Sequence, residues 1–147
     1  MRHPNNNLSK GGGILLGGVF LLMVSCASES VNQQDNVFLA QKKFTEAVRS
    51  ASLNSRSEMY AGLKEAIRLD PLESRYHWEL ARAYFADGDL EKAEKEFQQT
   101  IRLNENFSEA FKELGRLHMQ AGDLDKAIYY LKEGLKKPGV TTPQNIH

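Results

Sequence analysis

Apolar residues recur at helical spacing along residues 74–137, with short polar breaks between the helical stretches. In residues 74–86 the apolar or small positions are Leu80, Ala81, Tyr84 and Phe85, which share one side of an α-helix. Asp87-Gly88-Asp89 then interrupts the pattern, because glycine adopts the positive φ that ends a helix and Asp89 can cap the next one. The pattern therefore predicts two helices joined by a tight turn.

The same pair of helices is predicted twice, 34 residues apart. Shifting residues 74–107 onto 108–141 aligns Gly88-Asp89-Leu90 with Gly122-Asp123-Leu124, and Lys92-Ala93 with Lys126-Ala127. The alanine shared by both units lets the second helix approach the first closely. Self-similarity at this period is typical of solenoids, in which each unit buries its apolar face against the next.

These motifs identify a family resemblance. A 34-residue helix–turn–helix with Leu80-Ala81 or Leu114-Gly115, followed by Gly-Asp-Leu-x-Lys-Ala, resembles the tetratricopeptide repeat (TPR). The resemblance implies an all-α fold, a short α-solenoid of about three TPR helix–turn–helix repeats. We expect a TPR domain over 36–141, with repeats at 40–73, 74–107 and 108–141 and a tail at 142–147.

The first of these repeats is the most degenerate. It ends in Ile67-Arg68-Leu69-Asp70-Pro71, where proline blocks continuation of the helix. Ala47 keeps the small position and Ser57 is a candidate cap. Glu46, Ser50 and Met59, however, stand where the family has Leu, Tyr and Ala. Terminal repeats of solenoids are often atypical, because one of their faces meets solvent.

The first 26 residues predict export. A polar start with Arg2 and Lys10 precedes an apolar run over 11–24 and then Ser25-Cys26, which is the arrangement of a secretory signal. The apolar run is too short to cross a bilayer comfortably as a helix. Leu22-Met23-Val24-Ser25-Cys26 resembles the bacterial lipobox, and Cys26 is the only cysteine. The alternative is an ordinary cleaved signal peptide with an unmodified cysteine.

The lipobox resemblance implies that residues 1–25 are a cleaved lipoprotein signal peptide and that Cys26 is the lipidation site. Residues 26–35 would then be a flexible lipidated tether, and the acyl chains would anchor the protein to a membrane. Ala27 follows the cysteine where an Asp would retain the protein at the inner membrane. We therefore expect an outer-membrane lipoprotein of the bacterial cell envelope that faces the periplasm.

Charge and motifs exclude several function classes. Without residues 1–25 the chain carries two more acids than bases, so we expect no nucleic-acid partner, because phosphate binding needs clustered Lys and Arg. The sequence has no HExxH, GxSxG, P-loop or CxxC motif. His77 and His118 occupy core positions of the repeat. We expect no catalytic residues, no metal, no cofactor and no enzyme activity.

The resemblance also implies a concave groove, lined by the first helix of each repeat, that binds a protein or peptide. By repeat position the lining residues are Phe44, Val48, Arg75, Trp78, Arg82, Phe85, Lys112, Arg116 and Met119. We expect Trp78 to turn toward this groove, because it stands two residues before Leu80, whereas the family tryptophan stands three before. The alternative is that Trp78 packs against the helix of the preceding unit and closes a gap between repeats.

The lining residues also suggest a ligand chemistry. Arg82 and Arg116, with Lys112 nearby, form a basic stripe that suits a peptide with apolar anchors and one or two carboxylates. The alternative is that the arginines pair with Glu79 and Glu113. The two-carboxylate clamp of chaperone-binding TPR proteins is not expected, because its positions hold Phe44, Val48, Glu79, Glu109 and Glu113.

The last helix, expected over about 124–136, has no capping helix after it. Tyr129 or Tyr130 and Leu135 are therefore expected to be partly exposed, either as a surface for homo-oligomer formation or as tolerated apolar area. Taken with the lipobox and the repeats, the sequence predicts a lipid-anchored protein–protein interaction adaptor, with assembly of a pilus or secretion complex as the first candidate role. The alternatives are an adaptor for cell-wall enzymes or outer-membrane assembly, and a self-associating structural lipoprotein.

Overall fold

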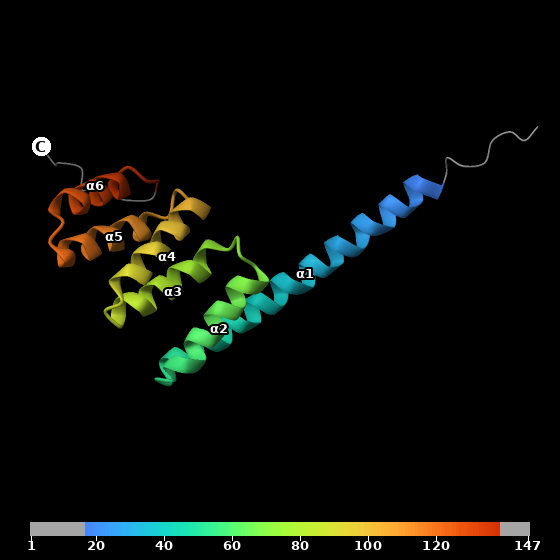
Figure 1. Ribbon diagram of the computed structural model, residues 1–147, viewed down its shortest axis with the longest axis horizontal. Helices are drawn as coiled ribbons and strands as arrows, with labels where there is room; N and C mark the ends of the chain where they lie inside the picture. The colour runs from blue at the N-terminus through green and yellow to red at the C-terminus, as the bar shows by residue number, and fades with distance from the viewer. Residues whose placement is uncertain (1–16, 139–147) are drawn as a thin grey trace, which may run out of the picture. The chain divides into compact units, whose positions relative to one another are not determined.

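The computed structural model describes residues 17–138, and for residues 17–32 the backbone alone. Within this range the chain forms six α-helices and no strand (Figure 1). The helices are α1 (Gly17–Ser52), α2 (Arg56–Leu69), α3 (Ser74–Ala86), α4 (Leu90–Leu103), α5 (Ser108–Ala121) and α6 (Leu124–Leu135). The predicted all-α helical solenoid is confirmed.

The N-terminal predictions fall largely outside the described residues. The chain divides into two compact units, Met1–Asp35 and Asn36–His147. The start of the predicted signal peptide, residues 1–16, lies outside the described range, as does the side chain of Cys26. Residues 26–35, expected as a flexible tether, have a helical backbone within α1. No helix in the described part of the chain is long and apolar enough to cross a membrane.

The second unit is a stack of helical hairpins. The end of α1 pairs with α2, α3 pairs with α4, and α5 pairs with α6, while α2 packs on α3 and α4 on α5. Small residues allow the close approach within each hairpin. Ala93 and Ala127 are buried at the shared alanine position. A Cβ on Gly115 would lie 2.6 Å from the Cγ of Leu131, so this glycine is needed where α5 meets α6.

In the first hairpin, a different residue allows the two helices to approach closely. Met59 stands at the alanine position and is only partly buried. The close approach occurs instead at Gly62, where a Cβ would lie 2.8 Å from the Cβ of Ala47. The contact has therefore moved by about one helical turn, which accounts for a degenerate repeat that still forms a tight hairpin.

Three turns join the two helices of a hairpin, and two of them have the predicted glycine and aspartate. Gly88 and Gly122 have φ of 81° and 80°, the left-handed conformation that favours glycine. The carboxylates of Asp89 and Asp123 accept hydrogen bonds from the backbone N–H of Lys92 and Lys126, each at 3.2 Å. These aspartates satisfy N–H groups that the first helical turn leaves unpaired.

The turn between α1 and α2 differs from its prediction. Asn54 takes the left-handed conformation there, with φ of 60°, because asparagine tolerates it better than other non-glycine residues. Ser57 is not a cap: α2 begins at Arg56, so Ser57 lies inside the helix. The capping position is Ser55, whose side chain makes no capping hydrogen bond.

The aspartate caps make the stability of the fold depend on pH. The side-chain and backbone hydrogen bonds from Lys92 lower the pKa of Asp89. A carboxyl whose pKa is lowered on folding stabilises the fold above its ordinary pKa, and this stabilisation is lost as the pH falls through the lowered value. We predict that Asp89→Ala lowers the thermal midpoint by roughly 4–8 °C near neutral pH, and that the difference from wild type shrinks in acid.

Circular dichroism melts across this pH range measure both effects. Glu105→Ala is the matched control, because Glu105 is an exposed loop carboxylate with no capping role. A difference between Asp89→Ala and wild type that stays constant down to strongly acidic pH would contradict the ionised cap.

Candidate functional site

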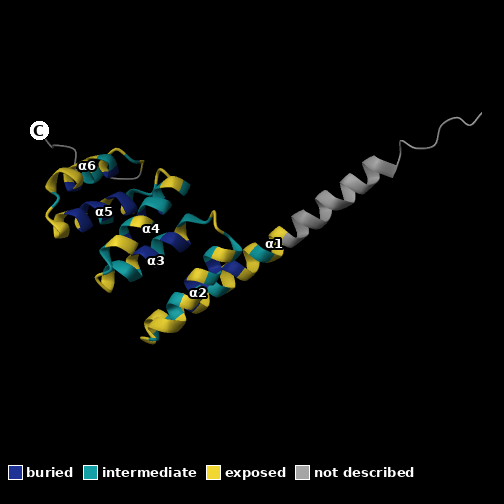
Figure 2. Cartoon of the chain, viewed as in Figure 1, coloured by how far each residue is buried: buried dark blue, intermediate teal, exposed yellow. Residues whose placement is uncertain are grey.

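The candidate site is the surface formed by the first helices of the hairpins, which we call the A-helix face. It comprises the predicted lining residues Phe44 and Val48 on α1, Arg75, Trp78, Arg82 and Phe85 on α3, and Lys112, Arg116 and Met119 on α5. Figure 2 shows that buried and exposed positions alternate along these helices, so each helix has one side in the core and one in solvent. Val48, Arg75, Arg82, Lys112, Arg116 and Met119 are exposed, Trp78 and Phe85 are half-buried, and Phe44 is buried.

Phe44 corrects one of the predictions. Only 7% of its surface is exposed, and its ring packs against that of Tyr76, with 4.9 Å between the centroids. The guanidinium of Arg75 lies 5.1 Å from the centre of the same ring. Phe44 therefore belongs to the core between the first two hairpins, covered by a residue that we expected to stand beside it. Burial also raises the pKa of the Tyr76 hydroxyl.

Arginines lie over aromatic rings along the whole A-helix face. Besides Arg75 over Phe44, Arg82 lies 5.8 Å from the ring of Trp78 and Arg116 lies 5.2 Å from the ring of Phe85. The Arg116 contact joins α5 to α3, as the Arg75 contact joins α3 to α1. Cation–π contacts of this kind contribute about 0.5–1 kcal/mol each at exposed sites. Arg75 and Arg116 thus link consecutive repeats.

Both arginines of the stripe also pair with acids, which was the alternative interpretation. Arg82 lies 3.2 Å from the carboxylate of Glu79, and Arg116 lies 2.6 Å from that of Glu113. Each acid stands three residues before its arginine on the same helix, so the pairs neutralise part of the positive charge. The side chains of Arg75 and Lys112, by contrast, form no ion pair with any described residue. These two cations remain available to a ligand carboxylate.

Trp78 takes a position that differs from both interpretations. Its ring lies 5.4 Å from that of Phe97 on α4 and 5.1 Å from that of Phe107, the residue that caps α5. Both of these rings belong to residues 74–107, so Trp78 packs within the second repeat, close to the start of α5. Its half-buried ring still contributes an edge to the A-helix face beside Arg82.

Sequence reasoning missed Phe107 and the hollow beside Arg75. Phe107 is the N-cap residue of α5 and precedes the helical pattern, so periodicity gives no signal for it. The hollow is lined by residues of α1 and α3 and the loop before α3, among them Gln41, Phe44, Asp70 and Arg75. Its lining brings together the cation of Arg75, the carboxylates of Asp70 and Glu73, and the polar side chains of Gln41, Thr45 and Tyr76.

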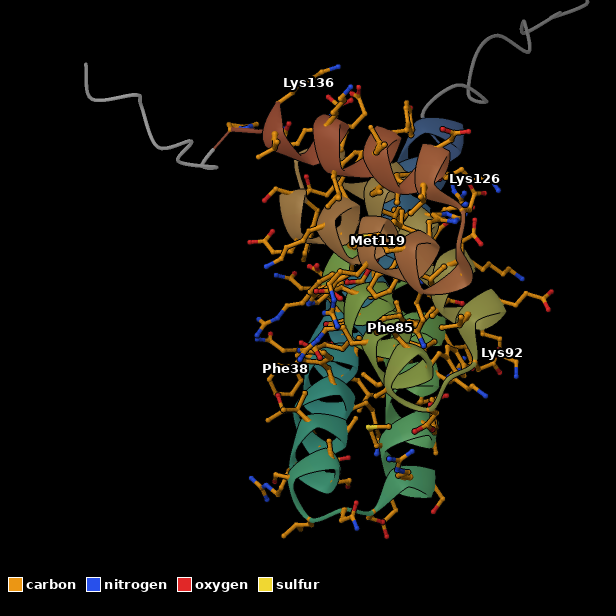
Figure 3. All side chains as sticks on the ribbon, turned by 90° about the vertical axis from the view of Figure 1, so that its left-hand side faces the viewer. Phe38, Phe85, Lys92, Met119, Lys126 and Lys136 are labelled. Carbon is orange, nitrogen blue, oxygen red and sulfur yellow. The ribbon has the colours of Figure 1, made fainter. Side chains whose placement is uncertain are left out.

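Apolar side chains on α3 and α5 complete the face. Phe85 and Met119, labelled in Figure 3, lie on these neighbouring helices. Met119 is exposed and flexible, and methionine adapts readily to irregular apolar surfaces. The A-helix face thus carries both apolar and basic side chains.

His77 and His118 are buried, as their repeat positions predicted, and each contacts neighbouring side chains. His77 Nδ1 lies 2.7 Å from the carboxylate of Glu96, and its Nε2 lies 3.3 Å from the backbone oxygen of Pro71. The ring of His118 stacks on that of Tyr130 at 5.3 Å, with Nε2 lying 3.5 Å from the carboxylate of Glu94. Within the described residues, no group of three or more His, Cys, Asp or Glu is placed to hold a metal ion.

Comparison with known proteins identifies the repeat. Residues 74–107 match the family model of the tetratricopeptide repeat. No curated protein matches the chain in sequence.

Solved structures with the same fold include a crystal structure of MamA, at 22% identity and a TM-score of 0.64, covering 66% of this chain and 57% of that one. The second TPR of Spaghetti (RPAP3) bound to the HSP90 peptide SRMEEVD has 22% identity and a TM-score of 0.65, covering 70% of this chain and 94% of that one. The N-terminal domain of stress-induced protein-1 from C. elegans has 14% identity and a TM-score of 0.65, covering 68% and 84%. The chain thus spans less than two thirds of the MamA chain, and at these identities the likeness concerns the fold.

Proposed function

We propose that this tetratricopeptide-repeat protein is an adaptor that binds a protein partner through its A-helix face and holds it at a membrane of the bacterial cell envelope. The observation that carries the first part is the composition of that face: the cations of Arg75 and Lys112, without acidic partners in the described chain, stand among the apolar groups of Phe85, Trp78 and Met119. Aromatic residues, methionine and arginine are the side chains enriched at protein interfaces. Such a surface suits a peptide with apolar anchors and a carboxylate.

The membrane part of the proposal rests on the sequence alone. Leu22-Met23-Val24-Ser25-Cys26 resembles a lipobox, and Ala27 favours the outer membrane. Within the envelope, we propose assembly of a pilus or secretion complex as the first role to examine. A partner among cell-wall enzymes or outer-membrane assembly factors is the alternative.

Partner binding is tested by substituting residues of the A-helix face that are exposed and do not form part of the core. We predict that Lys112→Glu with Met119→Glu lowers recovery of the partner by at least about tenfold, because the exposed cation and the apolar anchor both become acidic. Affinity purification from membranes followed by quantitative mass spectrometry measures the recovery. The matched control is Lys95→Glu with Leu72→Glu, which makes the same changes at exposed positions on α4 and in the loop before α3.

A partner recovered equally with both double variants would place the binding surface elsewhere. Trp78→Ala is a poorer test, because Trp78 also packs on Phe97 and Phe107. A loss of binding in that variant would not be separable from destabilisation of the second repeat.

The anchor is tested separately at Cys26. We predict that Cys26→Ser moves the protein from the membrane fraction to the soluble periplasmic fraction, because several acyl chains are required for stable anchoring. Intact-mass measurement of the wild type should show loss of residues 1–25 and gain of acyl chains. A mature wild-type protein without added lipid mass would contradict the anchor and leave the proposal for the A-helix face unaffected.

A further inference from the structure

Helix α6 carries an apolar row that the described residues leave largely uncovered, which we call the α6 stripe. It consists of Leu124, Ile128, Leu131 and Leu135, with Leu124, Ile128 and Leu135 exposed by 63%, 50% and 56% and Leu131 half-buried. Their alternating spacing of four, three and four residues places them on one side of the helix, in the pattern of a coiled-coil seam. The sequence indicated exposure only at Leu135 and at Tyr129 or Tyr130. Tyr129 is indeed exposed, whereas Tyr130 is half-buried against His118.

The equivalent residues of α4 show that such an apolar row packs against the next helix of the stack. A shift of 34 residues brings Leu124, Leu131 and Leu135 onto Leu90, Phe97 and Ile101 of α4, while Ile128 falls on Glu94. The three apolar α4 residues pack into the core cluster that also contains Leu114 and Leu117 of the next helix, α5. Helix α6 lies at the end of the stack (Figure 1) and keeps the apolar positions without that neighbour.

The α6 stripe is complementary to itself when two copies run antiparallel. The pairs Leu124/Leu135 and Ile128/Leu131 share one midpoint, so each leucine or isoleucine meets a large apolar residue of the second copy. In an antiparallel seam these are the expected pairings between the two apolar positions of the heptad.

The charges beside the stripe favour the same arrangement. Asp125 and Lys132 each stand one residue after a member of the stripe, on the same flank. In the antiparallel pair, Asp125 of each copy faces Lys132 of the other, which gives two ion pairs related by the two-fold axis. On the opposite flank, the buried Ala127 and Gly134 are small and uncharged. No like charges meet along the seam.

Two other arrangements of copies are disfavoured by the same charges. A parallel pair would set Asp125 and Lys132 of each copy against the flank of Ala127 and Gly134 of the other, so neither charge would have a charged partner. A head-to-tail contact would set α6 against the exposed row of α1, formed by Phe38, Lys42, Thr45 and Arg49 at the same spacing. Only one of those four residues is apolar, and the two basic residues would approach Lys132 and Lys136. Figure 3 marks Lys126 and Lys136 near the two ends of α6.

We infer that two copies of this chain associate through the α6 stripe in an antiparallel, two-fold arrangement. None of the A-helix-face residues lies on α6, so this interaction is independent of the proposed partner binding. Four apolar side chains per copy are fewer than a standard interface contains, so the dimer is weak, with a Kd of roughly 10–100 µM.

Charge reversal tests the arrangement in solution. Asp125→Lys gives four lysines at the two ion-pair sites, and Lys132→Asp gives four aspartates, so each variant alone should associate at least about tenfold more weakly than wild type. An equimolar mixture of the two variants restores an acid opposite every lysine and should regain wild-type association. Sedimentation of the full chain, in one mild detergent for all samples, measures each association constant.

Leu72→Glu is the control, since Leu72 is an equally exposed apolar residue outside α6. A wild-type chain that remains monomeric well above the expected Kd would overturn the inference. So would a mixture that associates no better than its components, or growth into open polymers.

Cross-linking tests the direction of the pair. In a Cys26→Ser background, copies with Leu124→Cys should form disulfides with copies carrying Leu135→Cys faster than either forms them with itself. Preferential Leu124→Cys self-cross-linking would show a parallel pair and would overturn the antiparallel arrangement.

Discussion

Replacing Phe97 with alanine is expected to destabilise the fold by about 3–5 kcal/mol, because the substitution leaves a large cavity in a close-packed core. Phe97 is completely buried, and its ring lies 5.4 Å from that of Trp78 and 6.4 Å from that of Phe85. Both partners also form part of the A-helix face. Since small domains are stable by only about 5–15 kcal/mol, the variant should lose a large share of its stability. Urea denaturation followed by circular dichroism measures the change.

Phe38→Ala is the matched control for this prediction. Phe38 is 73% exposed, so removing the same ring there should change the free energy of unfolding by no more than about 0.5 kcal/mol. Trp78 provides a local signal, because it is the only tryptophan in the chain and packs directly on Phe97. Its emission should shift to longer wavelength in the Phe97 variant. Equal stabilities of the two variants would contradict the packing at the centre of the second repeat.

The local chemistry of the repeats could be predicted from the sequence, because it repeats. Gly88 and Asp89 recur as Gly122 and Asp123, and in both places the glycine adopts positive φ and the aspartate caps the next helix. Periodicity also placed His77 and His118 in the core. The first repeat departs from the pattern, and there neither the role of Gly62 nor that of Asn54 follows from the family positions.

For the candidate site, the sequence predicted on which side of each helix a residue lies, but not how deeply its side chain is buried. Repeat position placed Arg75, Arg82 and Arg116 on the same exposed face, where the structure has them. It could not show that Phe44 is covered by Arg75, because that contact joins two repeats, or that Trp78 packs on Phe107, which lies in the loop before α5. The depth of a side chain depends on how neighbouring hairpins pack, and a pattern read along one helix contains no information about that packing.

The exposure of the α6 stripe likewise depends on packing between helices, because a residue is exposed when no neighbouring helix covers it. Leu124 and Ile128 have the spacing of core residues, and their equivalents in an inner repeat would face the next hairpin. Periodicity therefore identifies the face correctly, whereas exposure follows only from the absence of a covering helix in the described chain.

Gly115 is expected to show the second large effect, because it stands where α5 and α6 approach most closely. A Cβ at this position would lie 2.6 Å from the Cγ and 2.7 Å from a Cδ of Leu131, well inside van der Waals contact. Alanine is the better helix former by about 1 kcal/mol, but overpacking of this kind costs about 1–3 kcal/mol. We predict that Gly115→Ala destabilises the fold by about 1–2 kcal/mol, and that Gly115→Val destabilises it further.

A double-mutant cycle separates the steric effect from helix propensity. In a Leu131→Ala background the atoms that the new Cβ would meet are removed, so Gly115→Ala should become neutral or stabilising by up to about 1 kcal/mol. The coupling free energy between the two positions should therefore be about 2 kcal/mol. Measurements at low protein concentration keep any association through α6 out of the comparison, since Leu131 belongs to the stripe. If Gly115→Ala destabilised the fold equally in both backgrounds, the close contact with Leu131 would not be the reason for glycine at this position, and the α5–α6 hairpin would have to be held apart by other side chains.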